Sequence, residues 1–285
     1  MKPQVVLITG ANSGIGKETA KRFAQTGYVT YGGARRESTF SELTAIGCLP
    51  IRVDVTDEAS MIAAVQHIEQ AHGGVDVLVN NAGYGQLGPL EEIAMADMRR
   101  QFETNVFGLL RLSQLVLPEM RRRKSGRIIN VSSVGGEVTF PGAGAYHMSK
   151  YAVESLNDAL RYEVKPFGVK VISIQPGGVA TQFVAAGEST FDWGDPASPY
   201  HHFRKNLITT TRNMFTENSP FGILTPQQVA NVILHAAQSR RPRGRYKVGV
   251  LATLTPHVRR WIPDRLWDSM MTMLFPVETV LLPRQ

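Results

Sequence analysis

Short apolar segments rich in Val and Ile alternate along the chain with longer segments of helical periodicity. The apolar segments are residues 5–9, 28–32, 50–53, 75–79, 127–131, 169–174 and 245–250. The helical segments are residues 15–25, 58–71, 95–120, 145–166 and 226–238. Apolar strands separated by helices predict a parallel sheet that is covered on both faces. We expect a single α/β domain over residues 1–285, a Rossmann-like doubly wound sheet of about seven parallel strands.

The composition is that of a globular chain. Of 285 residues, 43% are hydrophobic and 19% are charged, which excludes a fibrous or disordered protein. Cys48 is the single cysteine, so we expect no internal disulfide, no cysteine-based metal cluster and a reducing, cytoplasmic compartment. The seven histidines have no metal-ligand spacing, and no metal site is predicted. No apolar stretch reaches about 18 residues, so no membrane-spanning helix is predicted.

The formal net charge is +7, which attracts an anionic cofactor, an anionic lipid surface or a nucleic acid. Residues 121–124 and 240–243 form two basic runs. Neither run contains interleaved aromatic residues, so we interpret both as solvated and predict no nucleic-acid partner.

A glycine-rich segment follows the first predicted strand and opens the first predicted helix. Glycine permits a tight turn and the close approach of a pyrophosphate, and the helix N-terminus supplies free N–H groups. The spacing differs from GxGxxG, and an ordinary strand-to-helix turn is the alternative. A P-loop is excluded, because Ala11 and Glu18 stand where that pattern requires Gly and Ser or Thr. The predicted cofactor-binding residues here are Gly10, Asn12, Ser13, Gly14, Ile15 and Gly16.

The end of the second predicted strand distinguishes NADP from NAD. An acidic residue there would bind the ribose hydroxyls of NAD, but the segment carries Arg35 and Arg36. Guanidinium groups bind phosphate through paired hydrogen bonds. We therefore predict NADP(H), with Arg35 as the main ligand of the 2′-phosphate and Arg36 as a weaker one. The alternative is a solvated pair for which Glu37 competes.

Further motifs extend this pattern over residues 4–250. They are Asp54, Asn80-Asn81-Ala82-Gly83, Asn105, Ser132-Ser133, Tyr146-His147-Met148-Ser149-Lys150 and the segment 176–181. The ordered set resembles the short-chain dehydrogenase/reductase family, in particular its NADP(H)-preferring retinol/hydroxysteroid dehydrogenase-like and carbonyl reductase members. Each motif follows a predicted strand or lies on the next helix, where open α/β sheets bind ligands.

The resemblance implies further cofactor contacts and an assembly. Asp54 with Val55 would lie at the adenine, and Lys150 with Tyr146 at the nicotinamide ribose. The remaining implied contacts are Asn81, Ala82 and Gly83 along the adenosine, and Pro176, Gly177, Val179 and Thr181 near the nicotinamide carboxamide. A homodimer or homotetramer formed through two long helices is also implied.

Tyr146 and Lys150 are the predicted centre of the chemistry. Of eight tyrosines, only Tyr146 has a lysine four residues later, which places both side chains on one helix face. A nearby ammonium should lower the pKa of the phenol, so that Tyr146 can exchange a proton with a carbonyl or an alcohol. Taken alone, such a pair is most often a surface pair. His147 is expected to face elsewhere.

Two further residues complete the predicted catalytic set. Ser133, 13 residues before Tyr146, is favoured over Ser132 for polarising the substrate oxygen, because of strand alternation and the family's spacing. The resemblance implies that Asn105 holds a water that connects Lys150 to solvent. An ordinary polar residue that stabilises a helix kink is the alternative for Asn105.

Residues 180–225 are predicted to form a substrate-binding lid, because the connection is too long for an ordinary loop. Its rings predict a lipophilic substrate, or else they pack into the core or an interface: Phe183, Phe191, Trp193, Tyr200, Phe203, Phe215 and Phe221. Residues 251–285 are predicted to be a helical extension with a stripe of Leu266, Met270 and Leu274, adjoined by Trp267 and Met271, that faces the core or an interface. Arginines beside Trp261 and Trp267 are also compatible with weak peripheral membrane contact.

The leading functional interpretation is an NADP(H)-dependent oxidoreductase acting on a lipophilic ketone, aldehyde or secondary alcohol. An NADPH-binding regulator without turnover is one alternative, although the complete set of Asn105, Ser133, Tyr146 and Lys150 favours an enzyme. An epimerase or dehydratase with the same fold is another.

Overall fold

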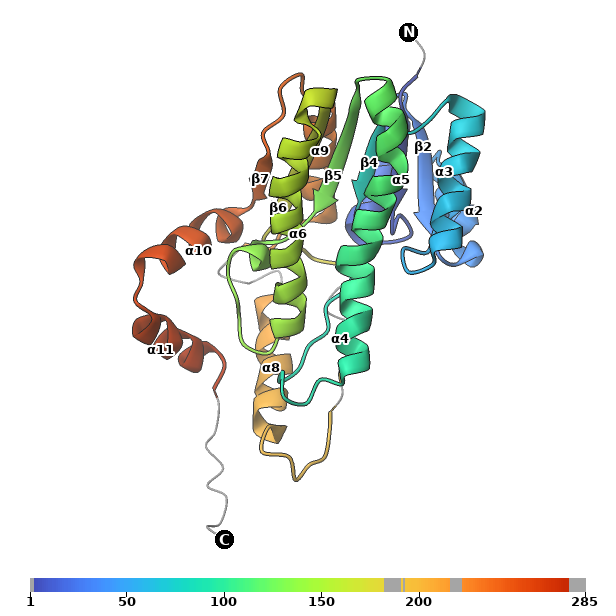
Figure 1. Ribbon diagram of the computed structural model, residues 1–285. Helices are drawn as coiled ribbons and strands as arrows, with labels where there is room; N and C mark the ends of the chain where they lie inside the picture. The colour runs from blue at the N-terminus through green and yellow to red at the C-terminus, as the bar shows by residue number, and fades with distance from the viewer. Residues whose placement is uncertain (1–2, 182–190, 192, 216–221, 277–285) are drawn as a thin grey trace.

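The computed structural model describes residues 3–181, 191, 193–215 and 222–276, whose arrangement is drawn in Figure 1. Within them, seven parallel strands form one sheet in the order β3-β2-β1-β4-β5-β6-β7, which confirms the predicted fold class. The strands are β1 (Val5–Thr9), β2 (Val29–Ala34), β3 (Leu49–Arg52), β4 (Val77–Asn80), β5 (Gly126–Val131), β6 (Val169–Pro176) and β7 (Arg245–Val248).

Helices cover both faces of the sheet. Leu7 and Ile8 are neighbours in β1 and both are fully buried, but they belong to cores on opposite faces because successive side chains of a strand alternate. The core around Ile8 is closed by α1 (Gly14–Gln25), α2 (Phe40–Ala45) and α9 (Pro226–Gln238). The core around Leu7 is closed by α3 (Glu58–His72), α5 (Gly108–Arg122) and α6 (Gly144–Glu163).

The helix predicted over residues 95–120 changes its winding near the middle. α4 (Met95–Phe102) is joined to α5 by a π-helical segment, Glu103–Phe107, which contains Asn105. The side chain of Asn105 accepts a hydrogen bond from the backbone N–H of Tyr84 at 3.1 Å and donates one to the Tyr84 carbonyl at 3.0 Å. Wider π turns are frequent at functional sites, and this one directs Asn105 toward the loop after β4.

Three further helices lie near the carboxyl ends of the strands (Figure 1): α8 (His201–Met214), α10 (Val250–Trp261) and α11 (Asp264–Leu274). The helix predicted near the C-terminus is present, but the stripe assigned to it is wrong. Trp267 and Met271 form the buried side of α11, whereas Leu266 is 53% exposed. The Trp267 ring packs with Val138 and Phe140, and this contact sets the rotation of the helix.

Single turns complete the described structure. The 3-10 helices are Glu37–Thr39, Val134–Gly136 and Lys165–Phe167. The last predicted strand is shorter than expected, because Gly249 has a φ of +90° and α10 begins at the next residue. None of the helices in the described ranges is long and apolar enough to cross a membrane.

Candidate active site

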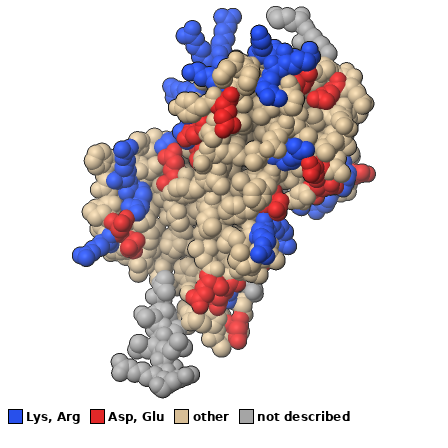
Figure 2. Space-filling view, in the orientation of Figure 1, with Lys and Arg blue, Asp and Glu red and all other residues tan. Residues whose placement is uncertain are grey.

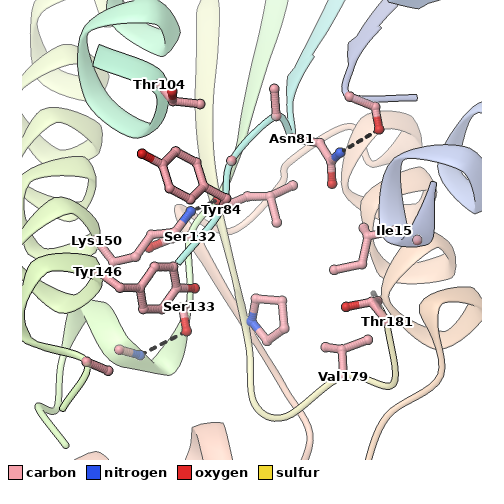
Figure 3. A pocket seen from close by; sticks show the side chains of 18 of the residues that line it. Ile15, Asn81, Tyr84, Thr104, Ser132, Ser133, Tyr146, Lys150, Val179 and Thr181 are labelled. Atoms are coloured by element: carbon pink, nitrogen blue, oxygen red, sulfur yellow. Dashed lines mark hydrogen bonds between the residues drawn. The ribbon is translucent and has the colours of Figure 1, made fainter. Parts of the chain in front are cut away.

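A cavity of about 720 Å³ lies where β1, β4, β5 and β6 end. In Figure 3, Ser133, Tyr146 and Lys150 lie on one side of it and Ile15, Val179 and Thr181 on the other. Nearly all predicted site residues line it: Gly10, Asn12, Ser13, Gly14, Ile15, Arg35, Arg36, Asp54, Val55, Asn81, Ala82, Gly83, Ser133, Tyr146, Lys150, Pro176, Gly177, Val179 and Thr181. The lining residues do not include Gly16 and Asn105, which are both buried.

The turn after β1 requires glycine at three positions. Gly10 and Gly14 have φ angles of +64° and +51°, in the left-handed region that favours glycine. A Cβ on Gly16 would lie 2.2 Å from the carbonyl oxygen of Gly10, so α1 packs directly on the turn. Ser13 is the N-cap of α1 but makes no side-chain hydrogen bond to the helix. The first N–H groups of α1 therefore lack a side-chain cap, and a pyrophosphate fits this cradle.

Asn81 fixes the other side of the turn. Its Nδ2 donates to the carbonyl oxygens of Thr9 at 3.0 Å and Gly10 at 3.3 Å. The Thr9 hydroxyl in turn accepts hydrogen bonds from the backbone N–H groups of Asn81 and Ala82, both at 3.0 Å. These contacts join the ends of β1 and β4, so Asn81 has a structural role here in addition to its place on the cavity wall.

Two cationic side chains follow β2 at the edge of the cavity. Arg35 and Arg36 are exposed and line it. Among the described residues no ion pair joins either arginine to Glu37, the predicted competitor. Asp54 lies nearby, where its Oδ1 accepts hydrogen bonds from the backbone N–H and the hydroxyl of Thr56 at 3.0 and 2.8 Å. The donor set fits a nucleotide with a phosphorylated ribose, since the guanidinium groups are free to bind a phosphate.

Tyr146 and Ser133 meet on the cavity wall. The Ser133 hydroxyl hydrogen-bonds the phenol of Tyr146 and accepts a hydrogen bond from the backbone N–H of Gly135 at 3.0 Å. Desolvation of the phenol raises the pKa of Tyr146 to about 12, and the bond to Ser133 opposes this rise. The predicted lowering of this pKa by Lys150 is therefore wrong for the chain alone. The Lys150 ammonium lies 5.7 Å from the centre of the phenol ring, and the pKa is set by desolvation and by the bond to Ser133.

Lys150 is buried one helical turn after Tyr146, on α6. Its Nζ donates a hydrogen bond to the Val131 carbonyl at 2.8 Å, which holds the ammonium at the end of β5. Burial lowers the pKa of Lys150 to about 8, and the charge of Glu154 opposes that shift. Ser132, which the sequence analysis ranked below Ser133, is buried beside Gly136, on the Glu154 side of this helix.

The side chain of Asn105 is committed to structural contacts. In addition to its two bonds with Tyr84, its amide donates to the hydroxyl of Ser149 at 3.0 Å. Both amide hydrogens are thus used. A water that connects Asn105 to Lys150 could therefore not accept a hydrogen bond from the amide of Asn105.

The other end of the cavity is apolar and includes residues that the sequence analysis missed. These are Leu87, Phe140, Leu207, Met214, Ile223, Leu251 and Phe275. They come from six separate segments, and no local motif marks them. Of the rings predicted on the lid, Phe215 lines the cavity, while Phe191 and Phe203 pack in a cluster with Leu87 and Phe275. Phe183 and Phe221 lie outside the described residues.

His147 lines the cavity, so the prediction that it faces elsewhere is wrong. Its Nδ1 lies 3.1 Å from the Gly135 carbonyl oxygen, and burial lowers its pKa. This contact holds the turn that carries Ser133. The described residues include no group of three or more His, Cys, Asp or Glu side chains arranged to hold a metal ion.

Comparison with known proteins identifies the family. The family model described as "short chain dehydrogenase" matches residues 4–190. The chain is 35% identical to a 3-ketodihydrosphingosine reductase of Bacteroides thetaiotaomicron, over 97% of this chain and 100% of that protein. It is 31% identical to an NADPH-dependent 3-dehydrocapnine reductase of Ornithobacterium rhinotracheale, over 92% and 94% of the two chains.

A solved structure gives the same result. The crystal structure of a short-chain dehydrogenase from Streptomyces avermitilis is 33% identical, with a TM-score of 0.78 over 95% of this chain and 97% of the other. The sheet, the site at its carboxyl edge and these relatives agree that the chain belongs to the short-chain dehydrogenase/reductase family of oxidoreductases.

Proposed function

We propose that the chain transfers a hydride between NADP(H) and a lipophilic ketone, aldehyde or secondary alcohol, with Tyr146 as general acid or base. The observation that carries this proposal is the hydrogen bond between Ser133 and Tyr146, with Lys150 one helical turn away, in the cavity that the glycine-rich turn also lines.

Each catalytic side chain has a role that follows from its position. A pKa of about 12 keeps the phenol of Tyr146 protonated at neutral pH, the form that donates a proton to a carbonyl oxygen. The hydroxyl of Ser133 lies beside that phenol and polarises the same oxygen. The ammonium of Lys150 adds positive charge behind Tyr146. A bound nicotinamide would supply or accept the hydride.

Two observations support NADP(H) over NAD(H). Arg35 and Arg36 stand at the end of β2, where an acidic side chain would favour NAD. The Ornithobacterium rhinotracheale relative is named as NADPH-dependent. The named reductases among the relatives also favour an oxidoreductase over the NADPH-binding regulator.

The proposed substrate is a lipid ketone. Both named relatives are reductases, of 3-ketodihydrosphingosine and of 3-dehydrocapnine. The apolar end of the cavity, closed by Leu207, Met214 and Phe275, is suited to a hydrocarbon chain. Because α8 supplies two of these side chains, we also propose that residues 180–225 act as the substrate-binding lid.

The test is the consumption of NADPH with a panel of lipid ketones, including 3-ketodihydrosphingosine, and bulky aldehydes. Replacing Tyr146→Phe removes the proton donor and should reduce kcat by at least about 100-fold. Tyr151→Phe is the matched control, since Tyr151 lies on the same helix but is 44% exposed. Undiminished turnover by Tyr146→Phe would refute the proposed role. Tight NADPH binding with no turnover on any substrate would favour the regulator instead.

We also propose two surface contacts, one between copies of this chain and one with a lipid surface, and they use different parts of the molecule. Phe107, Met148 and Tyr151 are exposed on the π-helical segment and α6, and Figure 2 shows this face with few charged groups, which supports a homodimer or homotetramer. On α10, Leu254 and Trp261 are exposed near Arg260, which supports weak contact with an anionic lipid surface. Absence of co-sedimentation with anionic vesicles would exclude the second contact.

A further inference from the structure

A buried carboxylate continues the catalytic helix face beyond Lys150. Tyr146, Lys150 and Glu154 follow one another at four-residue intervals on α6, so they lie on one side of the helix. Glu154 is 6% exposed. Its Oε1 accepts a hydrogen bond from the Ser173 hydroxyl at 2.6 Å, and its Oε2 accepts one from Arg245 Nε at 2.9 Å. A buried carboxylate with two hydrogen-bond donors is held in one orientation.

Gly136, which has no side chain, packs directly against Glu154 and the main chain of Lys150. A Cβ on Gly136 would lie 2.8 Å from Cγ of Glu154 and 2.9 Å from the carbonyl oxygen of Lys150. The same Cβ would lie 3.2 Å from the hydroxyl of Ser132. The segment after β5 therefore presses on the turn of α6 that connects the two charged residues.

The charged groups around this turn come from every element that packs on it. Arg245, on β7, binds both Glu154 and Asp158, the latter at 2.6 Å. Lys247, also on β7, is paired with Glu137 at 2.7 Å. Asp158 is also paired with Arg161 at 2.7 Å. Because the Lys247–Glu137 pair is neutral, the charges near this turn are Lys150, Arg245 and Arg161 against Glu154 and Asp158. If the charge of Glu154 is removed, the remaining carboxylate of this group is Asp158, which is already paired with both Arg245 and Arg161, and the buried ammonium of Lys150 is left without compensation.

We propose that Glu154 is a positioning residue whose buried negative charge keeps Lys150 in its ammonium form during catalysis. This inference rests on the proposed function for its catalytic meaning. The direction in which Glu154 shifts the pKa of Lys150 agrees with it, since the charge of Glu154 opposes the lowering by burial. Glu154 itself touches none of the residues assigned to proton transfer to the substrate. Its effect is electrostatic and acts through Lys150.

The direct test is the titration of Lys150 in the chain without cofactor, followed by NMR of lysine labelled at the ε-carbon and assigned with Lys150→Met. The wild-type signal should titrate near pH 8. In Glu154→Gln, which keeps the shape of the side chain and an oxygen for Ser173, the midpoint should fall by about one pH unit. Asp158→Asn is the matched control. It also removes one carboxylate from Arg245, but one turn further from Lys150, and the midpoint should stay at the wild-type value.

Activity gives the second readout. In the NADPH-dependent reduction, the alkaline limb of kcat/KM should move to lower pH in Glu154→Gln and remain unchanged in Asp158→Asn. Glu154→Asp keeps the charge and should keep the wild-type limb, even if the variant unfolds at a lower temperature. Equal midpoints for Lys150 in the wild type and in Glu154→Gln would overturn the inference, as would equal shifts in Glu154→Gln and Glu154→Asp. Because the NMR titration needs no turnover, failure of the proposed function would leave this result readable.

Discussion

The two sides of the cavity are held in place by different forces. On the cofactor side, hydrogen bonds to backbone carbonyls fix the turns: the N–H of Ala11 bonds to the Gly33 carbonyl at 3.0 Å, and the side-chain amide of Asn81 bonds to the Thr9 carbonyl at the end of β1, also at 3.0 Å. On the substrate side, α8 is attached through side chains. Arg204 pairs with Glu92 at 2.5 Å, and Asn206 donates to the Pro276 carbonyl at 3.0 Å. The comparison indicates that cofactor affinity and substrate selectivity can be changed separately.

The largest effect is expected on the cofactor side. Gly16→Ala places a methyl group 2.2 Å from the Gly10 carbonyl oxygen and 2.5 Å from Nδ2 of Asn81. Neither atom can move without opening the turn, so the Kd of NADPH should rise by about 100-fold, as measured by fluorescence titration. Gly244→Ala is the control, since the nearest atoms to its added Cβ belong to the flexible side chain of Arg161, at 3.2 Å. Wild-type affinity for NADPH in Gly16→Ala would show that the turn after β1 does not bind the pyrophosphate.

The next effect separates the two nicotinamide cofactors. Arg35→Ala removes a guanidinium that we expect to bind the 2′-phosphate, and a hydrogen-bonded charge of this kind contributes about 1.5–3 kcal/mol. The value of kcat/KM for NADPH should fall by about 10- to 100-fold, while that for NADH should not change. Arg36→Ala should give a smaller loss. A parallel loss with both cofactors would assign Arg35 a structural role.

These two sides also differed in how far the sequence could predict them. The cofactor side is encoded locally, because glycines at fixed offsets and residues at strand ends occupy positions that the sheet itself determines. The predicted strand boundaries agree with the structure to within about two residues, and the favoured Ser133 hydrogen-bonds Tyr146. The substrate side depends on contacts between distant segments. Phe275 and Leu87 belong to one cluster although 188 positions separate them, and no short pattern contains that information.

The errors have physical reasons of the same kind. The rotation of α11 is set by the Trp267 ring against Phe140, a tertiary contact that the apolar periodicity of the helix does not specify. The pKa of Tyr146 depends on how much water the fold removes from the phenol, which spacing along a helix cannot give. The cavity-facing orientation of His147 likewise follows from its contact with Gly135 in a neighbouring turn.

A smaller effect should appear on the substrate side alone. Glu92→Gln leaves the guanidinium of Arg204, whose side chain is 4% exposed, without its counter-charge, and α8 should loosen locally. We expect KM for a bulky ketone to rise by about tenfold with no change in the Kd of NADPH. Glu91→Gln is the control, because the bond that Glu91 makes within the described residues, with the Tyr200 hydroxyl, is exposed. If both constants change together in Glu92→Gln, the two sides of the cavity are not independent.

The smallest effect concerns the pH dependence of the unfolding free energy, which depends on the buried ammonium of Lys150. The pKa of Lys150 is about 8 in the folded chain and about 10.5 when unfolded, so the unfolded state binds more protons between these values and stability rises with pH. From pH 7 to pH 9 the wild type should gain about 1 kcal/mol of unfolding free energy relative to Lys150→Met, measured by urea denaturation at each pH.

Tyr146 does not contribute in this window. Its pKa of about 12 is raised above its usual value, so it lowers stability only above about pH 10. Parallel curves for the wild type and Lys150→Met would mean that the Lys150 ammonium is not desolvated in the folded chain. Burial of a charged Lys150 would then not be a feature of the catalytic side of the cavity.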